Sequence, residues 1–206
     1  MRRWLLASLT ILVVGVGSVI YFSYQNSLGK VVISIDPAAS AKIVKQTGEN
    51  PVRETTVRSF QTNFNGKLKK GSYLLVTSAG ADYSNVRQGF TVGPTTTALS
   101  VKLNYSDAKL AQLATTQVPD INAVFNAQYP GMAGRYSLQK IFLYGRGDWA
   151  GALVVPTDPN QDTLRVIFQK ANNQCKVATV PPVISIGYPV YPNIPRALIV
   201  QANNLK

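Results

Sequence analysis

The feature of this sequence that most limits its fold is a long apolar run close to the N-terminus. No charged residue lies between Arg3 and Lys30, and the 20 residues 4–23 within this gap are almost all apolar or small. As a helix, a run of this length spans about 30 Å, the thickness of the hydrocarbon core of a bilayer. The run therefore predicts a single transmembrane helix, within a signal-anchor segment that we place at residues 1–29.

Aromatic and basic residues at the two ends of the run predict how it is anchored and oriented. Trp4 at one end and Tyr21 and Tyr24 at the other lie where interfacial aromatic side chains are preferred. Arg2 and Arg3 precede the run, and the positive-inside rule keeps such residues in the cytoplasm. We therefore expect a single-pass protein of the cell membrane, with a cytoplasmic N-terminus and extracytoplasmic C-terminal domains.

A cleaved signal peptide is the alternative interpretation of the same run. The apolar stretch of a signal peptide normally has about 7–15 residues and ends in a small-x-small cleavage site. The present run is longer and is followed by bulky residues such as Tyr21 and Phe22, which favours an uncleaved anchor. Cleavage near residues 15–18 stays open.

Beyond residue 30 the sequence changes to short β-branched stretches with turn residues between them. The expected strands are 31–35, 41–45, 72–77, 90–92 and 98–103. Short strands at a spacing of about ten residues are typical of an antiparallel β-sandwich. We expect such a sandwich over residues 30–105.

Three stretches of this region resemble the PEGA-type domains, small prealbumin-like β-sandwiches found on bacterial surface proteins. The stretches are the strand followed by Asp-Pro at Val31–Pro37, the Leu68–Val76 segment and the closing strand Thr97–Leu103. The signature tetrapeptide of the family is missing, and residues 48–51 only approximate its turn. The resemblance implies a binding or spacer module and brings no catalytic residues with it.

The remaining residues indicate a helical segment followed by a second β-rich part. Ser106 and Asp107 can cap a first helical turn and Pro119 can open another, so residues 106–135 are expected to form a helical connector. Its helix can also belong to the domain that follows. Strands expected within 136–180 and a helix from Pro195 predict a small α+β domain with a strand meander at 136–206.

The C-terminal part resembles an uncharacterised α+β domain of membrane-anchored bacterial surface proteins. The similarity rests on the Gly-x-Gly-Asp-Trp-Ala unit at 145–150 and on Tyr-Pro-Asn-Ile-Pro at 191–195. No activity is assigned to that family, so the resemblance implies none. Cys175 occupies a position that is usually tryptophan in this pattern, and we expect it to be a buried apolar thiol.

The composition argues against most catalytic centres. The 206 residues include no histidine and a single cysteine, which excludes Ser-His-Asp and Cys-His centres, an intrachain disulfide and an iron–sulfur site. We expect no cofactor, no metal and no enzymatic activity. The alternative is a cell-wall hydrolase or transpeptidase, because Ser137 and Lys140 form the S-x-x-K pair of penicillin-recognising enzymes. That pair normally opens a helix, whereas here it falls in an expected strand.

Arg146, Gly147 and Asp148 spell an R-G-D tripeptide between two expected strands. On an exposed turn these residues present a cation and a carboxylate, a pattern that suits an adhesion receptor on a host cell. A Gly-Asp pair is also an ordinary turn element that needs no function. Both interpretations stay open.

Positive charge is the most informative surface property. The net charge is +12, and without Arg2 and Arg3 the chain still holds 19 basic and 9 acidic residues. Lys67, Lys69 and Lys70 form the one local cluster.

Such a field attracts anionic polymers, and no motif for specific nucleic-acid recognition accompanies it. We therefore expect a membrane-anchored, extracytoplasmic, non-catalytic binding or scaffolding protein of the bacterial cell envelope. Its expected partner is an anionic wall polymer, an envelope protein or a host surface. A passive structural spacer is the remaining alternative.

Overall fold

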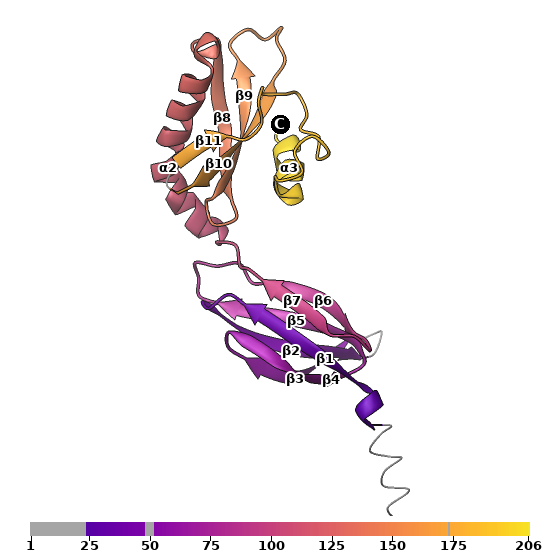
Figure 1. Ribbon diagram of the computed structural model, residues 1–206. Helices are drawn as coiled ribbons and strands as arrows, with labels where there is room; N and C mark the ends of the chain where they lie inside the picture. Colours follow the sequence, from indigo (N-terminus) through magenta and orange to yellow (C-terminus); the bar gives the residue numbers. More distant parts are fainter. Residues whose placement is uncertain (1–23, 48–51, 173) are drawn as a thin grey trace, which may run out of the picture. The chain divides into compact units, whose positions relative to one another are not determined.

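The computed structural model describes residues 24–47, 52–172 and 174–206, and these residues form two compact units. The first unit holds the described residues up to Gly80 together with Asn85–Lys102. The second unit holds Ala81–Ser84 and Leu103–Lys206. Each unit has its own sheets and its own buried core (Figure 1).

From Leu28 onward, the named elements of the first unit are strands. They are β1 (Leu28–Ile35), β2 (Ala39–Thr47), β3 (Arg53–Phe60), β4 (Asn63–Lys69), β5 (Gly71–Ala79), β6 (Arg87–Val92) and β7 (Thr97–Val101). They form a three-stranded sheet in the order β4-β1-β7 and a four-stranded sheet in the order β3-β2-β5-β6.

One strand pair departs from the antiparallel arrangement that the sequence predicted. β1 pairs with β4 in antiparallel register but with β7 in parallel register, from Val31 opposite Thr97 to Ile35 opposite Val101. The chain enters β7 from β6, which belongs to the other sheet, and this crossover brings β7 alongside β1 in the same direction. The three-stranded sheet is therefore mixed.

Alternation along the strands builds the core of the first unit. Val31, Ile33 and Ile35 of β1 are buried, while the intervening positions are more exposed. β5 repeats the pattern with Tyr73 and Leu75. Each sheet thus has one apolar face, and the two sheets bury these faces against each other.

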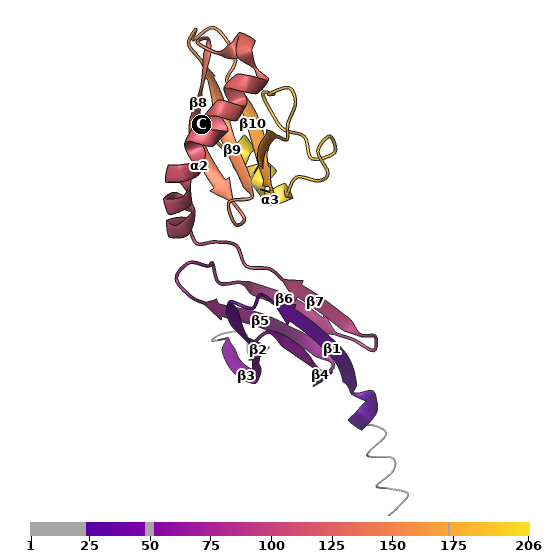
Figure 2. The ribbon, with the colours of Figure 1, turned by 60° about the vertical axis from the view of Figure 1, so that its left-hand side comes forward.

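The second unit combines a strand meander with helices. Its elements are α2 (Asp107–Gln128), the short 3-10 helix η1 (Pro130–Met132), β8 (Tyr136–Tyr144), β9 (Trp149–Pro156), β10 (Leu164–Ala171), β11 (Gln174–Val177) and α3 (Arg196–Asn203). The four strands are antiparallel and lie in the order β11-β10-β9-β8. Helix α2 lies on one face of this sheet and α3 on the other (Figures 1 and 2).

Helix α2 is one continuous helix of 22 residues rather than a connector of two short turns. Pro119 removes one backbone hydrogen bond within it. The helix nevertheless continues, because apolar side chains on both sides of Pro119 pack on the same core: Leu110 and Leu113 before it, and Ile121 and Phe125 after it. Burial of this face outweighs the interruption by proline.

Helices cover both faces of the meander, which explains why the inner strand β9 is apolar along most of its length. Five consecutive residues of β9, from Ala150 to Val154, are buried. One face packs under α2 around Phe125 and Phe168, and the other packs under α3 around Ile167 and Leu198. A strand covered on both faces is apolar throughout instead of alternating.

The expected fold class and localisation are both wrong on one point. In the part of the chain that the structure describes, strands in three sheets dominate, and no helix is long and apolar enough to cross a membrane. A single N-terminal transmembrane helix is therefore not found, and the single-pass localisation that depended on it is corrected with it. The run at residues 4–23 on which both expectations rested lies outside the described residues.

A close backbone approach in the first unit gives a test of its packing. A Cβ atom on Gly29 of β1 would lie 2.3 Å from the backbone oxygen of Gly93. We predict that Gly29→Ala lowers the free energy of unfolding by about 1–3 kcal/mol, because backbone has to move to admit the methyl group. Chemical denaturation measures the change.

Gly89→Ala on β6 is the matched control, because no atom lies within 4 Å of its Cβ position. Equal stability of the two variants would contradict the close approach at Gly29.

Candidate functional site

The strongest candidate for a functional surface is a group of lysines on the outer face of the β4-β1-β7 sheet. Lys67 and Lys69 are exposed on β4, on either side of buried Leu68. Lys30 of β1 is also exposed and lies directly opposite Lys67 in the strand register. We call these three residues, Lys30, Lys67 and Lys69, the basic face.

The geometry of the basic face follows from the pleat of the sheet. Residues two apart on a strand are about 7 Å apart, and directly opposed side chains begin about 5 Å apart at Cβ. Lys30, Lys67 and Lys69 therefore lie close together on one surface. The ammonium group of Lys67 donates a hydrogen bond of 3.2 Å to Oε1 of Gln25. Lys70 is exposed in the turn after β4 and lies outside the strand register.

No acidic residue occurs in β1, β4 or β7. The other exposed positions of β1 and β4 on this face are the neutral polar residues Ser34, Asn63 and Asn65. Glu54 belongs to the other sheet, where it pairs with Arg87 and accepts a hydrogen bond from Gln46. These two hydrogen bonds, the one from Gln46 first, lower the pKa of Glu54. The positive charge of the basic face is therefore not balanced within its own sheet.

Part of this group was predicted from the sequence. Lys67, Lys69 and Lys70 are close neighbours in the sequence and were predicted together, whereas Lys30 was not predicted. Lys30 joins the group through the pairing of β1 with β4, which are separated by β2 and β3 along the chain. The alternation of Lys67 and Lys69 around Leu68 was the available signal that both lysines share one face.

The R-G-D turn differs from the exposed turn that was expected. Gly147 is buried, and its Cβ position lies close to the side chains of Gln117 and Leu113 of α2. One carboxylate oxygen of Asp148 accepts a hydrogen bond of 2.8 Å from the backbone N–H of Arg146. The carboxylate therefore closes its own turn.

Arg146 is also engaged inside the second unit. Its Nε donates a hydrogen bond of 3.0 Å to the carbonyl oxygen of Leu103. Its guanidinium group lies 5.3 Å from the ring centroid of Tyr83 and 5.9 Å from that of Tyr105. These cation–π contacts and the hydrogen bond give Arg146 a structural task, which the tripeptide alone does not reveal.

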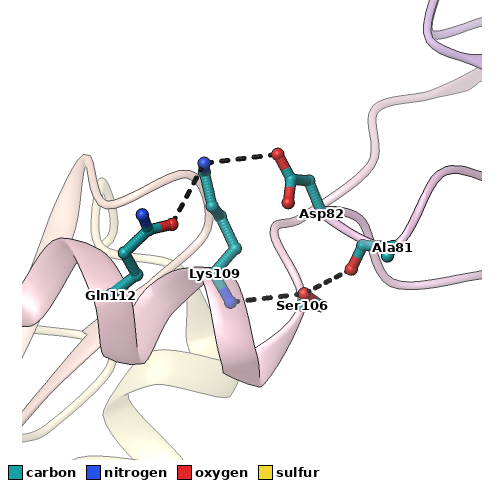
Figure 3. A network of polar contacts seen from close by, with 5 residues as sticks. All are labelled: Ala81, Asp82, Ser106, Lys109 and Gln112. Atoms are coloured by element: carbon teal, nitrogen blue, oxygen red, sulfur yellow. Dashed lines mark hydrogen bonds and ion pairs between the residues drawn. The ribbon is translucent and has the colours of Figure 1, made fainter.

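A polar network joins the segment 81–84 to the start of α2 (Figure 3). Ser106 is the N-cap: its hydroxyl accepts from the N–H of Lys109 and donates to the carbonyl oxygen of Ala81 at 2.8 Å. The ammonium group of Lys109 lies 3.2 Å from a carboxylate oxygen of Asp82 and donates to Gln112 at 3.3 Å. The network thus fixes the first turn of the helix. Asp82 and Lys109 are paired with each other in this network.

The S-x-x-K pair lies in strand β8 and does not open a helix. The hydroxyl of Ser137 accepts a hydrogen bond from Gln139 at 3.3 Å. Lys140 lies at an irregularity of the strand with a φ of 48°, and its ammonium group contacts the carbonyl oxygen of Lys206. The strand context argues against the hydrolase or transpeptidase alternative, whose pair requires a helix start.

The remaining candidate residues are placed as follows. Trp4, Tyr21, Arg2 and Arg3 lie outside the described residues, whereas Tyr24 is described and is 53% exposed. Within the described residues no group of three or more acidic or cysteine side chains is arranged to hold a metal ion.

Comparisons with known proteins give no match. No protein-family model matches the chain, and neither curated proteins nor solved structures show significant similarity to it.

The structural task of Arg146 can be tested directly. We predict that Arg146→Ala lowers the free energy of unfolding by about 2 kcal/mol, because it removes a charged hydrogen bond and two cation–π contacts. Denaturation in urea measures this change. Arg135→Ala is the control, since Arg135 is exposed and its side chain makes no hydrogen bond or ion pair in the described part of the chain. Unchanged stability of Arg146→Ala would contradict this structural role.

Proposed function

We propose that this chain is a non-catalytic binding protein for a linear anionic polymer, which it holds on the basic face of the β4-β1-β7 sheet. The proposed polymer is a phosphate-rich chain of the kind found in bacterial cell walls. The observation that carries the proposal is the direct opposition of Lys30 and Lys67 in the β1–β4 register.

Opposed lysines are unfavourable for the fold on their own account. Like charges directly across an antiparallel pair destabilise the sheet. A local rule that is broken without compensation inside the fold is a common mark of a functional site. A bound polyanion would supply the missing compensation, because its charges would lie between the two ammonium groups.

Protection of an edge strand is the competing explanation for exposed lysines. β4 is an edge strand, and lysines on edge strands prevent pairing with other chains. This explanation covers Lys67 and Lys69 but not Lys30, because β1 is the central strand of its sheet. The position of Lys30 therefore favours binding over edge protection.

The spacing of the lysines on the basic face suits a ligand with repeated negative charges. Its lysines lie at intervals of about 5–7 Å on a surface without acidic neighbours in the same sheet, so a flexible polymer can place several charges at once. Exposed lysines give weak, screened contacts one by one. Affinity would therefore come from several contacts and would fall steeply with salt. The PEGA-like character of the sandwich is part of this proposal, since such domains generally act as binding or spacer modules.

The test measures the binding of fluorescently labelled poly(glycerol phosphate) at several salt concentrations, with fluorescence anisotropy as the readout. We predict that Lys67→Gln combined with Lys69→Gln weakens binding at low salt by about tenfold. It should also reduce the magnitude of the slope of log affinity against log salt by roughly 1.5, because about two counterion-releasing contacts are lost.

The matched control is Lys42→Gln combined with Lys45→Gln. It removes the same charge from exposed positions of β2 in the other sheet. Equal weakening by both double variants would mean that only the net charge matters. Absence of binding by the unaltered chain at low salt would contradict the proposal.

A further inference from the structure

A cavity of about 340 Å³ lies in the second unit, between helix α2 and the sheet face that the helix covers. Its lining comes from α2, from the turn before β9 and from the strands β9, β10 and β11. The lining residues used below are Gln117, Asp120, Ile121, Val124, Lys170 and Cys175. The cavity lies wholly within the second unit and is separate from the basic face.

The inner wall of the cavity is apolar. Ile121, Ala150 and Phe168 line it and are buried members of the core under α2, and Val124 packs against the same core. This wall can take up a short aliphatic or aromatic group. The volume lies near the lower end of the range for small-molecule sites and is too small for a polymer.

The cavity is lined by one acidic and one basic side chain, which come from different elements. Asp120 comes from α2 and Lys170 from β10, and both line the cavity. Neither side chain makes an ion pair or a hydrogen bond within the described residues, so the two charges do not neutralise each other by contact. Gln117 of α2 adds an amide that can donate and accept.

Both charged groups lie near the single thiol of the chain. Burial raises the pKa of Cys175, the positive charge of Lys170 opposes that change, and the negative charge of Asp120 adds to it. Cys175 also pairs directly with Lys170 across the β10–β11 hairpin. The thiol is therefore neutral at physiological pH and acts as part of the wall.

From this arrangement we propose that the cavity binds a small zwitterion of the amino-acid type with an apolar side chain. Its ammonium group pairs with Asp120, its carboxylate pairs with Lys170, and its side chain lies on Ile121, Val124 and Phe168. The opposite charges on two walls select a ligand that carries both charges, and the apolar wall selects an uncharged side chain. A ligand with only one charge leaves either Asp120 or Lys170 without a partner.

The test uses the single cysteine as a reporter. Cys175 is the only cysteine of the chain and lines the cavity, so the rate of its alkylation by iodoacetamide at pH 8 reports whether the cavity is filled. The probes are L-phenylalanine, hydrocinnamate, which lacks the ammonium group, and phenethylamine, which lacks the carboxylate. We expect 10 mM L-phenylalanine to slow alkylation at least threefold, which corresponds to a dissociation constant of about 5 mM or below for a ligand of this size. The two singly charged probes should slow it by less than half as much.

Variants of the charged residues separate this site from a general apolar pocket. Asp120→Asn should abolish the advantage of L-phenylalanine over hydrocinnamate, and Lys170→Gln should abolish its advantage over phenethylamine. The matched controls are Asp107→Asn on the same helix and Lys176→Gln on β11, because neither residue lines the cavity. Both controls should retain the full effect.

Three outcomes would overturn the proposal. Equal protection by all three probes would mean an apolar pocket without selection for charge. Circular dichroism first confirms that the unaltered chain is folded. If 10 mM L-phenylalanine then gives no protection of Cys175, the cavity does not bind such a ligand. Equal loss of protection in the control variants would mean that the lining charges do not act specifically. None of these outcomes bears on polymer binding by the basic face, so the two proposals fail independently.

Discussion

The register between β1 and β4 is the constraint on which the interpretation of the first unit depends. It sets Lys30 opposite Lys67 and leaves both exposed, while Val31 and Leu68 are buried. Because side chains alternate with a period of two, a shift of one residue would bury lysines and expose the core. Burial of the apolar positions therefore fixes where the lysines lie. The same register that closes the core also creates the unfavourable charge pair on the surface.

The second unit shows the same dependence of surface chemistry on packing. Its sheet is covered on both faces, and the apolar side chains of α2 hold that helix in place in spite of Pro119. Asp120 follows that proline and lines the cavity beside the sheet. The R-G-D turn is held in place by two hydrogen bonds. The carboxylate of Asp148 accepts one from the backbone of Arg146, and the side chain of Arg146 donates the other to the carbonyl oxygen of Leu103. Arg146 and Asp148 thus make contacts within the unit that the tripeptide does not reveal, and Asp120, which was not selected from the sequence, lines the cavity.

The sequence predicted those strands whose apolar residues alternate. The strands expected at 31–35 and 72–77 lie within β1 and β5, and the helix expected from Pro195 corresponds to α3. It missed β3 and β4, because both are edge strands with mostly exposed, polar residues and carry little apolar pattern. The parallel pairing of β1 with β7 was also missed, since pairing between distant strands leaves no local signal. For the same reason Lys30 could not be assigned to the basic face from the sequence, whereas Lys67 and Lys69 could.

Lysine footprinting gives a direct test of polymer binding on the basic face. The unaltered chain is labelled by reductive methylation with and without poly(glycerol phosphate), and the modification of each lysine is measured by mass spectrometry. We predict that the polymer protects Lys30, Lys67 and Lys69 together, while Lys42 and Lys45 on the other sheet of the same unit react as before. Uniform protection of all five lysines, or protection of Lys42 and Lys45 alone, would contradict it.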